Sequence, residues 1–542
     1  MRRSIGAALL VGALVGGCGT EPPCPECGVI VIASGADADA LLPVFADGVG
    51  RTVSDQLFLK LADVGLAANT VGDSGFVPRL AESWAFEDDR TLAFRLRAEA
   101  RWHDGTPVTA GDVVFTYAVY RDTVIGSAAG PHVAAIDSVR ARDDRTAVFY
   151  FARAYPEQFF DATHHMRILP RHLLDSVPRA AWRTHPLARR PVGNGPFRLA
   201  EWRPGELIEL LADSGFFGGV PGPARLIWRI VPDFNAAVTQ LVGQEADFVE
   251  AVVGPENVGR VEAADHLRLV EYSSTVYIYL GFNLRGPNGR GAHPLFQDRA
   301  LRRALTVAVN REVIIEAVLG GWGAIPPGPT TAAVWVAEGA APQLPYDSAE
   351  AARQLDALGW RDTDGDGIRD RDGQPLAFDL LYPSSSGIRQ RAGVILQEQF
   401  RLVGAAVQLM PVEFNVWLDR ARAGRFDAIL GAWLIDLPPG SMRAMWGTSG
   451  IGGSNYDAYA SPVFDSLVDR AAETTDPGTA RALWHEALQV INDDAPAVWL
   501  FSPKTLAGVN RRLTNVTLRP DEWWATVWTW KSGRRQGVGG GG

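Results

Sequence analysis

Residues 102–115 read Trp-His-Asp-Gly-Thr-Pro-Val-Thr-Ala-Gly-Asp-Val-Val-Phe, a stretch that joins turn-forming residues to the start of a helix. Residues 103–107 include the Asp, Gly and Pro that favour a tight turn. Thr109 is a suitable N-cap for a helix that contains residues 112–117. His103 belongs to the turn, where a histidine held by local hydrogen bonds is more common than one that transfers a proton or binds a metal. The stretch therefore predicts a turn and a capped helix that serve as scaffold.

Further motifs lie on both sides of this stretch and occur in a fixed order from about Val29 to about Trp530. They are Pro78–Trp84, Phe94–Arg97, Gly193–Phe197, Gly243–Asp247, Gly281–Asn283, Leu301–Leu305, Ala308–Arg311, Gly424–Asp427 and Asn455–Tyr456. Together with residues 102–115 they resemble the family 5 extracellular solute-binding proteins, which include the peptide-binding lipoproteins of bacterial ABC importers. Asn194 and Asn310 stand where the family commonly has Thr and Asp.

The resemblance implies an α/β fold of the two-lobed periplasmic-binding-protein type, type II-like and of cluster C, with an extra subdomain inserted in lobe one. The expected divisions are lobe one at residues 29–65, 191–273 and 502–532, the inserted subdomain at 66–190, and lobe two at 274–501. Ligand is expected between the lobes, which close about a hinge.

The residues themselves also indicate an α/β pattern, because short β-rich runs alternate with amphipathic helices. Strands are predicted at Val29–Ala33 and Leu226–Val231. Helices are predicted at Asp298–Val309, Ala392–Leu402 and Ala480–Ile491. In the first of these, Leu301, Ala304, Leu305 and Ala308 share one face, and Arg299, Arg302 and Arg303 are expected largely on others.

The N-terminus predicts export. Arg2 and Arg3 precede the short apolar run Ile5–Val15, and Leu14–Cys18 resembles a bacterial lipobox. We expect a signal peptide at residues 1–17, lipidation of Cys18 and a tether at residues 18–28, and therefore a periplasmic, membrane-anchored lipoprotein. Cys24 and Cys27 fall in that tether, and the Gly-rich residues 533–542 are expected to be disordered.

Composition restricts the class of partner. The chain has 542 residues, which predicts more than one hydrophobic core, and its 62 acidic against 52 basic residues make nucleic acid an unsuitable partner. Beyond Cys27 the chain has no cysteine, so disulfides do not hold the body together. We expect a monomer that meets a small-molecule ligand and the permease subunits of an ABC transporter.

The candidate binding segment is Trp433-Leu434-Ile435-Asp436, which follows the apolar run Ala428–Ala432. In peptide-binding members of the family, a Trp-x-x-Asp segment supplies the carboxylate that pairs with the peptide ammonium group. The resemblance therefore implies Asp436 as the ammonium ligand, Trp433 as a cleft wall, and Leu434 and Ile435 as sources of backbone hydrogen bonds. The alternative for Asp436 is a loop carboxylate with no ligand role.

The same resemblance places Asn455 among the ligand-binding residues. The continuation Leu437-Pro438-Pro439 departs from the acidic one that is usual in peptide binders. Nickel, haem or oligosaccharide binding by the same fold is the alternative function, and a peptide hydrolase is the alternative from the enzyme class.

We expect neither catalysis nor a cofactor or metal. Residues 362–373 place carboxylates as an EF-hand loop does, but Gly373 stands where the bidentate Glu belongs, so a polar turn is the preferred interpretation. Residues 384–387 do not form a nucleophile elbow. His164 and His165 are adjacent, and neighbours do not share a helix face.

Overall fold

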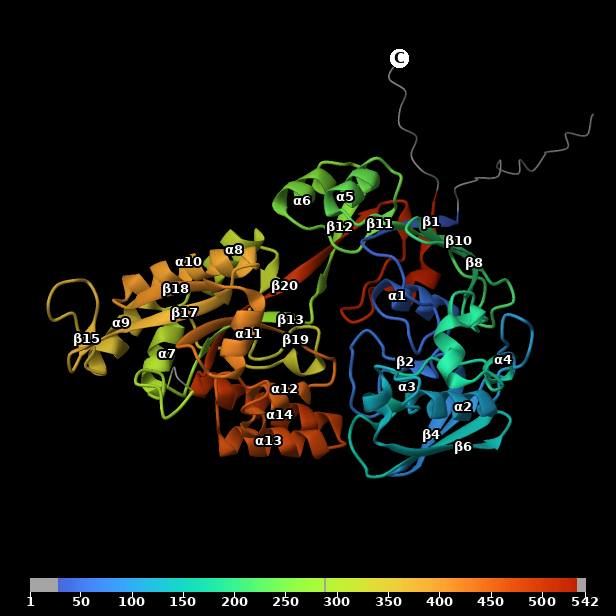
Figure 1. Ribbon diagram of the computed structural model, residues 1–542, viewed down its shortest axis with the longest axis horizontal. Helices are drawn as coiled ribbons and strands as arrows, with labels where there is room; N and C mark the ends of the chain where they lie inside the picture. The colour runs from blue at the N-terminus through green and yellow to red at the C-terminus, as the bar shows by residue number, and fades with distance from the viewer. Residues whose placement is uncertain (1–27, 287–288, 534–542) are drawn as a thin grey trace, which may run out of the picture.

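The structure is a computed structural model that describes residues 28–286 and 289–533. The predicted signal peptide, the lipidated Cys18, Cys24, Cys27 and the tail beyond residue 533 lie outside the described residues. We name the body built from residues 28–273 and 502–533 lobe one, and the body built from residues 274–501 lobe two. Figure 1 shows the two bodies side by side, joined by a few crossing strands.

One mixed sheet of 12 strands runs through both lobes in the order β18-β17-β19-β13-β20-β11-β1-β10-β9-β8, with β12 and β14 also paired to β20. Its lobe-one strands are β1 (Val29–Ser34), β8 (Phe197–Arg203), β9 (Leu207–Ala212), β10 (Arg225–Ile230), β11 (Phe248–Val249) and β12 (Leu267–Ser273). Its lobe-two strands are β13 (Val276–Phe282), β14 (Gly323–Ala324), β17 (Ala377–Pro383), β18 (Ala406–Val412) and β19 (Ala428–Leu434).

The long strand β20 (Ala497–Asn510) belongs to both lobes. Its first residues pair with β13, as in Leu280 opposite Val498, and its later residues pair with β12, as in Val270 opposite Ala507. The chain therefore crosses between the lobes on neighbouring strands, which is where a hinge of this architecture would lie (Figure 1).

Successive side chains of a strand point to opposite faces of the sheet, and lobe two has one hydrophobic core on each face. Ile278, Leu280 and Phe282 of β13 face a core that includes α7 (Arg299–Val307), α8 (Arg311–Leu319), α9 (Ser348–Ala357) and α10 (Gly387–Leu402). Tyr277 and Tyr279 face the opposite core, under α11 (Phe414–Arg422), α12 (Ser441–Trp446), α13 (Pro462–Glu473) and α14 (Pro477–Asp494).

Lobe one also carries a separate sheet of four antiparallel strands, β4 (Ala81–Asp88), β5 (Thr91–Leu96), β7 (Thr146–Phe151) and β6 (Ile136–Asp143). The α-helices of lobe one are α1 (Gly48–Leu57), α2 (Ala110–Tyr120), α3 (Gln158–Thr163), α4 (Arg171–Leu174), α5 (Phe234–Val242) and α6 (Pro255–Glu262). The side chains under this small sheet, such as Phe94 and Phe149, are continuous with the core around Leu226 and Trp228. Hydrophobic packing thus unites the small sheet with lobe one.

The predicted cap of α2 is confirmed. Thr109 forms a capping box with Asp112, whose Oδ2 accepts a hydrogen bond from the Thr109 backbone N–H at 2.8 Å. The Asp112 Oδ1 also accepts from the Arg171 N–H at 3.0 Å. One carboxylate therefore caps α2 and holds the start of α4 against it.

His103 is held by hydrogen bonds, as predicted, but its partners belong to a distant motif. Its Nδ1 accepts from the Gly193 N–H at 3.2 Å and its Nε2 lies 3.0 Å from the Gly195 carbonyl oxygen. Burial lowers the pKa of His103. A Cβ on Gly193 would lie 1.9 Å from the Leu57 carbonyl oxygen, so this close approach requires glycine.

Three helix predictions need correction in detail. α10 begins more than a turn before Ala392, because the Ser386 hydroxyl caps the Arg389 N–H. α14 begins at Pro477, where Asp476 caps the Thr479 N–H. Arg302 lies inside the core rather than off the buried face, because its guanidinium donates to the Asp494 carbonyl oxygen at 2.6 Å and the Ala495 carbonyl oxygen at 3.1 Å, at the end of α14.

Candidate functional site between the lobes

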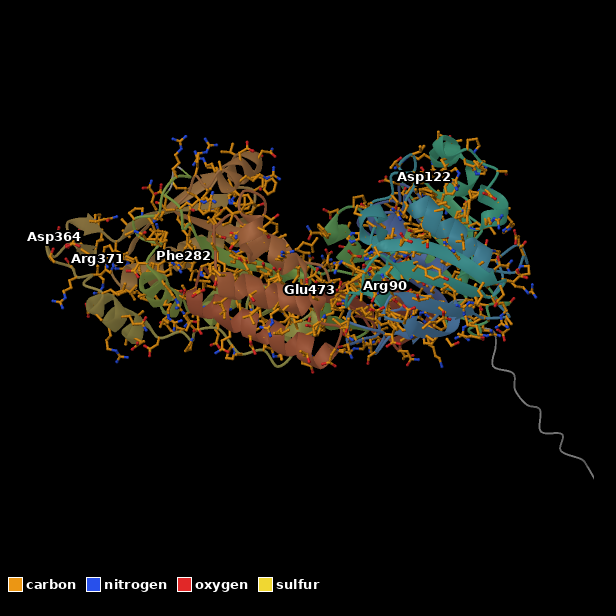
Figure 2. All side chains as sticks on the ribbon, turned by 90° about the horizontal axis from the view of Figure 1, so that it is seen from below. Arg90, Asp122, Phe282, Asp364, Arg371 and Glu473 are labelled. Atoms are coloured by element: carbon orange, nitrogen blue, oxygen red, sulfur yellow. The ribbon has the colours of Figure 1, made fainter. Side chains whose placement is uncertain are left out.

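A cavity of about 820 Å³ lies between the two lobes. Lobe one contributes residues around α3, the preceding segment 128–135 and the C-terminal residues 520–524. Lobe two contributes Thr275, residues 434–441 and Ala472. Figure 2 labels Arg90 of lobe one and Glu473 of lobe two where the two bodies face each other. Its volume is in the range of pockets that enclose small ligands.

Residues 434–436 of the predicted segment form the lobe-two edge of this cavity. The Ile435 N–H donates to the Thr275 carbonyl oxygen at 2.9 Å, which extends the pairing of β19 with β13 by one step. Leu434 is 71% exposed and Asp436 is also exposed, whereas Ile435 is buried. Leu434, Ile435 and Asp436 all line the cavity.

Asp436 offers a carboxylate that is not already used. Within the described part of the chain, it takes part in no ion pair or side-chain hydrogen bond. A carboxylate at a cavity wall that is in no ion pair can accept an ammonium group from a ligand.

Trp433 and Asn455 lie behind this edge and are not among the residues that line the cavity. Trp433 is half-buried and stacks on Tyr456. Asn455 is buried, and its side-chain amide donates to the carbonyl oxygens of Gly447 and Tyr459 at 2.9 and 2.8 Å. Its own oxygen accepts from the Tyr459 N–H at 3.2 Å. These bonds hold the loop that presents Tyr456.

Sequence reasoning missed the acidic part of the lobe-one wall of the cavity. The Tyr155 hydroxyl donates to Asp161 at 2.8 Å, and Glu157 lies one helical turn before Asp161. Burial, together with the neighbouring Asp161, raises the pKa of Glu157 to about 7, and burial raises that of Asp161 to about 7. The spacing of Glu157 and Asp161 in the sequence is the only signal that could have found them.

Histidines cover the same wall. His132 stacks on His165 with ring centroids 4.3 Å apart, and His165 Nε2 lies 3.7 Å from Asp161 Oδ1. His164 and His165 both line the cavity although they are adjacent, because they follow the last residue of α3. Burial lowers the pKa of each of these two histidines well below the usual value.

A buried ionic cluster forms the floor under this wall. Glu522 accepts hydrogen bonds from Lys60 at 2.6 and 2.8 Å, from Arg167 at 2.7 Å and from Arg519 at 2.7 Å. Burial opposes the charge, but Lys60 and Arg167 hold the pKa of Glu522 well below its usual value. Asp55 and Asp63 complete the cluster by pairing with Arg167 and Arg519.

Two groups of side chains have metal-ligand spacing among the described residues. Donor atoms of His164, Asp521 and Glu522 lie within 4.8 Å of one another, but the Glu522 oxygens already serve the three cations. Asp362, Asp364 and Asp366 form the second group, which is exposed. The Asp362 carboxylate accepts from the Gly365 and Gly367 N–H groups, as a polar turn does, and Figure 2 shows Asp364 at the far end of lobe two.

Comparison with known proteins identifies the relatives of this chain. The family model described as bacterial extracellular solute-binding proteins, family 5 Middle, matches residues 75–456. The oligopeptide-binding protein AppA of Bacillus subtilis is 29% identical, with 82% of this chain and 83% of that protein covered. Protein XP55 of Streptomyces lividans is 30% identical, with 86% and 82% covered.

Two solved structures superpose on most of this chain. The structure of Bacillus subtilis AppA in complex with a nonapeptide superposes with a TM-score of 0.66 at 26% identity, covering 93% of this chain and 99% of that chain. The ABC transporter substrate-binding protein CtaP of Listeria monocytogenes gives a TM-score of 0.77 at 22% identity, with the same coverage. The predicted two-lobed α/β fold is thereby confirmed.

Proposed function

The chain belongs to the bacterial extracellular solute-binding proteins of family 5, and we propose from this premise that it captures peptides for an ABC importer. The observation that carries the proposal is the unpaired Asp436 at the edge of a cavity between two lobes. The printed name of AppA, an oligopeptide-binding protein, supports peptides as the ligand class.

The free edge of β19 supports binding of an extended chain. β17 pairs with β19 at Ala428 and Ile429, and the described strands leave that edge unpaired further along, toward Leu434. Backbone groups on this edge can form main-chain hydrogen bonds with a peptide, which tolerates many side chains. Asp436 would then pair with the peptide ammonium group, because a charge in a closed cleft is costly without a partner.

The other predicted site residues fall into two groups in this proposal. Leu434 and Ile435 contact the ligand directly, whereas Trp433 and Asn455 support the cavity edge from behind. We assign the lobes and the inserted subdomain 66–190 the boundaries expected from the sequence, with the hinge where β20 passes from β13 to β12. Closure of the lobes around the ligand would create the shape that the permease recognises.

We further propose that the protein is exported to the periplasm as a monomer, anchored through lipidated Cys18, and that it releases its ligand unchanged. Among the residues that the structure describes, no helix is both long and apolar enough to cross a membrane.

Native mass spectrometry of the purified protein, followed by calorimetry with a peptide pool, tests the function. A retained peptide mass and peptides recovered intact are expected. A bound nickel, haem or oligosaccharide mass would contradict the peptide assignment, and shortened peptides would indicate a hydrolase.

A further inference from the structure

Lobe one contains a second cavity of about 370 Å³ that the proposed function does not use. Its walls come from the end of α1, from residues 77–79 before β4, from Arg97 after β5, from residues 216–218 and from Trp528. Glu522 lines both this cavity and the interlobe cavity, so the ionic cluster separates the two.

One wall of this second cavity is aromatic. The Phe216 ring lies 4.7 Å from that of Phe217 and meets the edge of Trp528 at 5.9 Å. A Cβ on Gly218 would lie 2.5 Å from the Phe216 ring, so the turn folds tightly against this wall. The arrangement gives a preformed surface for an apolar or aromatic group.

Two arginine side chains lie over the rings of this aromatic wall. The Arg79 guanidinium lies over Trp528 at 5.6 Å and pairs with Asp63 at 3.1 Å. The Arg97 guanidinium lies over Phe217 at 5.4 Å, and its Nε donates to the Arg79 carbonyl oxygen at 2.8 Å. No carboxylate of the described chain pairs with Arg97.

The charges of the neighbouring ionic cluster are already matched. Ion pairs join Lys60, Arg79, Arg167 and Arg519 to Asp55, Asp63, Asp521 and Glu522. Arg97 is therefore an additional positive charge at a half-buried position, beside an apolar wall. A cation in such a place favours an anionic ligand, and a guanidinium edge matches the two oxygens of a carboxylate.

We propose that this cavity binds a small aromatic monocarboxylate, with its carboxylate on Arg97 and its ring against Phe216, Phe217 and Trp528. A zwitterionic peptide fits poorly here, because the carboxylates that line the cavity, Asp55, Asp63 and Glu522, already pair with cations of the ionic cluster and leave its ammonium group without a free partner. An inorganic anion fits poorly as well, because it would leave the aromatic wall in contact with water. The second ligand therefore differs in class from the one proposed for the interlobe cavity.

Titration of the purified protein with phenylacetate, followed by calorimetry and ligand-observed NMR, tests the site. We expect phenylacetate to bind. Phenylacetamide, which lacks the charge, and acetate, which lacks the ring, should each bind at least tenfold more weakly. Arg97→Gln should weaken phenylacetate binding roughly tenfold or more, since it removes a charge-assisted hydrogen bond. Arg95→Gln is the matched control, because Arg95 pairs with Glu82 and does not line the cavity.

Asp436→Ala separates this site from the interlobe cavity and should leave phenylacetate binding unchanged. Phe217→Leu should weaken it, and this variant decides the matter if Arg97→Gln does not fold. The proposal is overturned if phenylacetate does not bind, if phenylacetamide binds equally well, or if Asp436→Ala abolishes binding.

Discussion

The indole ring of Trp433 stacks on the phenol ring of Tyr456, with ring centroids 5.3 Å apart and ring planes inclined by 23°. Tyr456 is itself placed by Asn455, whose side chain holds the loop through buried hydrogen bonds. The buried side chain of Asn455 is therefore linked, through Tyr456 and Trp433, to β19, which ends at the interlobe cavity.

Asn455→Ala should destabilise the protein and weaken peptide binding together. Buried acceptors that lose their donor cost about 1–3 kcal/mol each, so the urea midpoint should fall clearly. Tyr456→Phe keeps the stacked ring and is the control, with little change expected in either property. Weaker peptide binding at unchanged stability would instead make Asn455 a direct ligand contact.

Asp436→Ala should weaken the binding of peptides with a free N-terminus. Loss of one partner of a buried charge pair costs about 2–5 kcal/mol, which corresponds to roughly thirtyfold to several thousandfold in Kd. Calorimetry with wild type and variant measures this, and Asp364→Ala, at the far end of lobe two in Figure 2, is the control. Equal affinity in both proteins would remove Asp436 from the site.

Local patterns predicted the parts of this fold that depend on nearby residues. The N-cap at Thr109 was predictable because the cap, the turn before it and the carboxylate at Asp112 all lie within one short stretch. The β19 segment and its Asp436 were found through the resemblance to a family, since their role depends on the lobe opposite.

Features that join distant residues could not be predicted from the pattern. Arg302 looks like a surface residue of an amphipathic helix, but it satisfies the last carbonyl groups of α14. Gly193 requires glycine because of the Leu57 carbonyl, which belongs to another segment. The acidic pair Glu157 and Asp161 becomes part of a cavity wall only when the lobes are placed side by side.

Glu157→Gln should stabilise the protein at pH 8 and leave it unchanged at pH 4. Because the pKa of Glu157 is about 7 in the folded state, against an ordinary value of 4.5, the folded protein holds a proton that the unfolded chain releases in this window. Wild-type stability therefore falls as pH rises between about 4.5 and 7. The gain at pH 8 should be on the order of 1 to 3 kcal/mol.

Urea denaturation at the two pH values measures this difference. Glu99→Gln provides the control, because Glu99 is exposed and does not line the interlobe cavity. An equal shift at pH 4 and pH 8 would mean that the substitution acts through packing rather than through the proton.

Glu522→Gln should destabilise lobe one strongly. Its carboxylate is shared by Lys60, Arg167 and Arg519, and its removal leaves these buried cations with too little negative charge. Breaking such a cluster costs about 3–5 kcal/mol, whereas an exposed pair contributes little. The matched control is Glu87→Gln, which breaks an exposed bidentate pair with Arg142 at 2.7 Å and should leave the unfolding midpoint nearly unchanged. Comparable losses in the two variants would show that burial does not set the strength of these ion pairs.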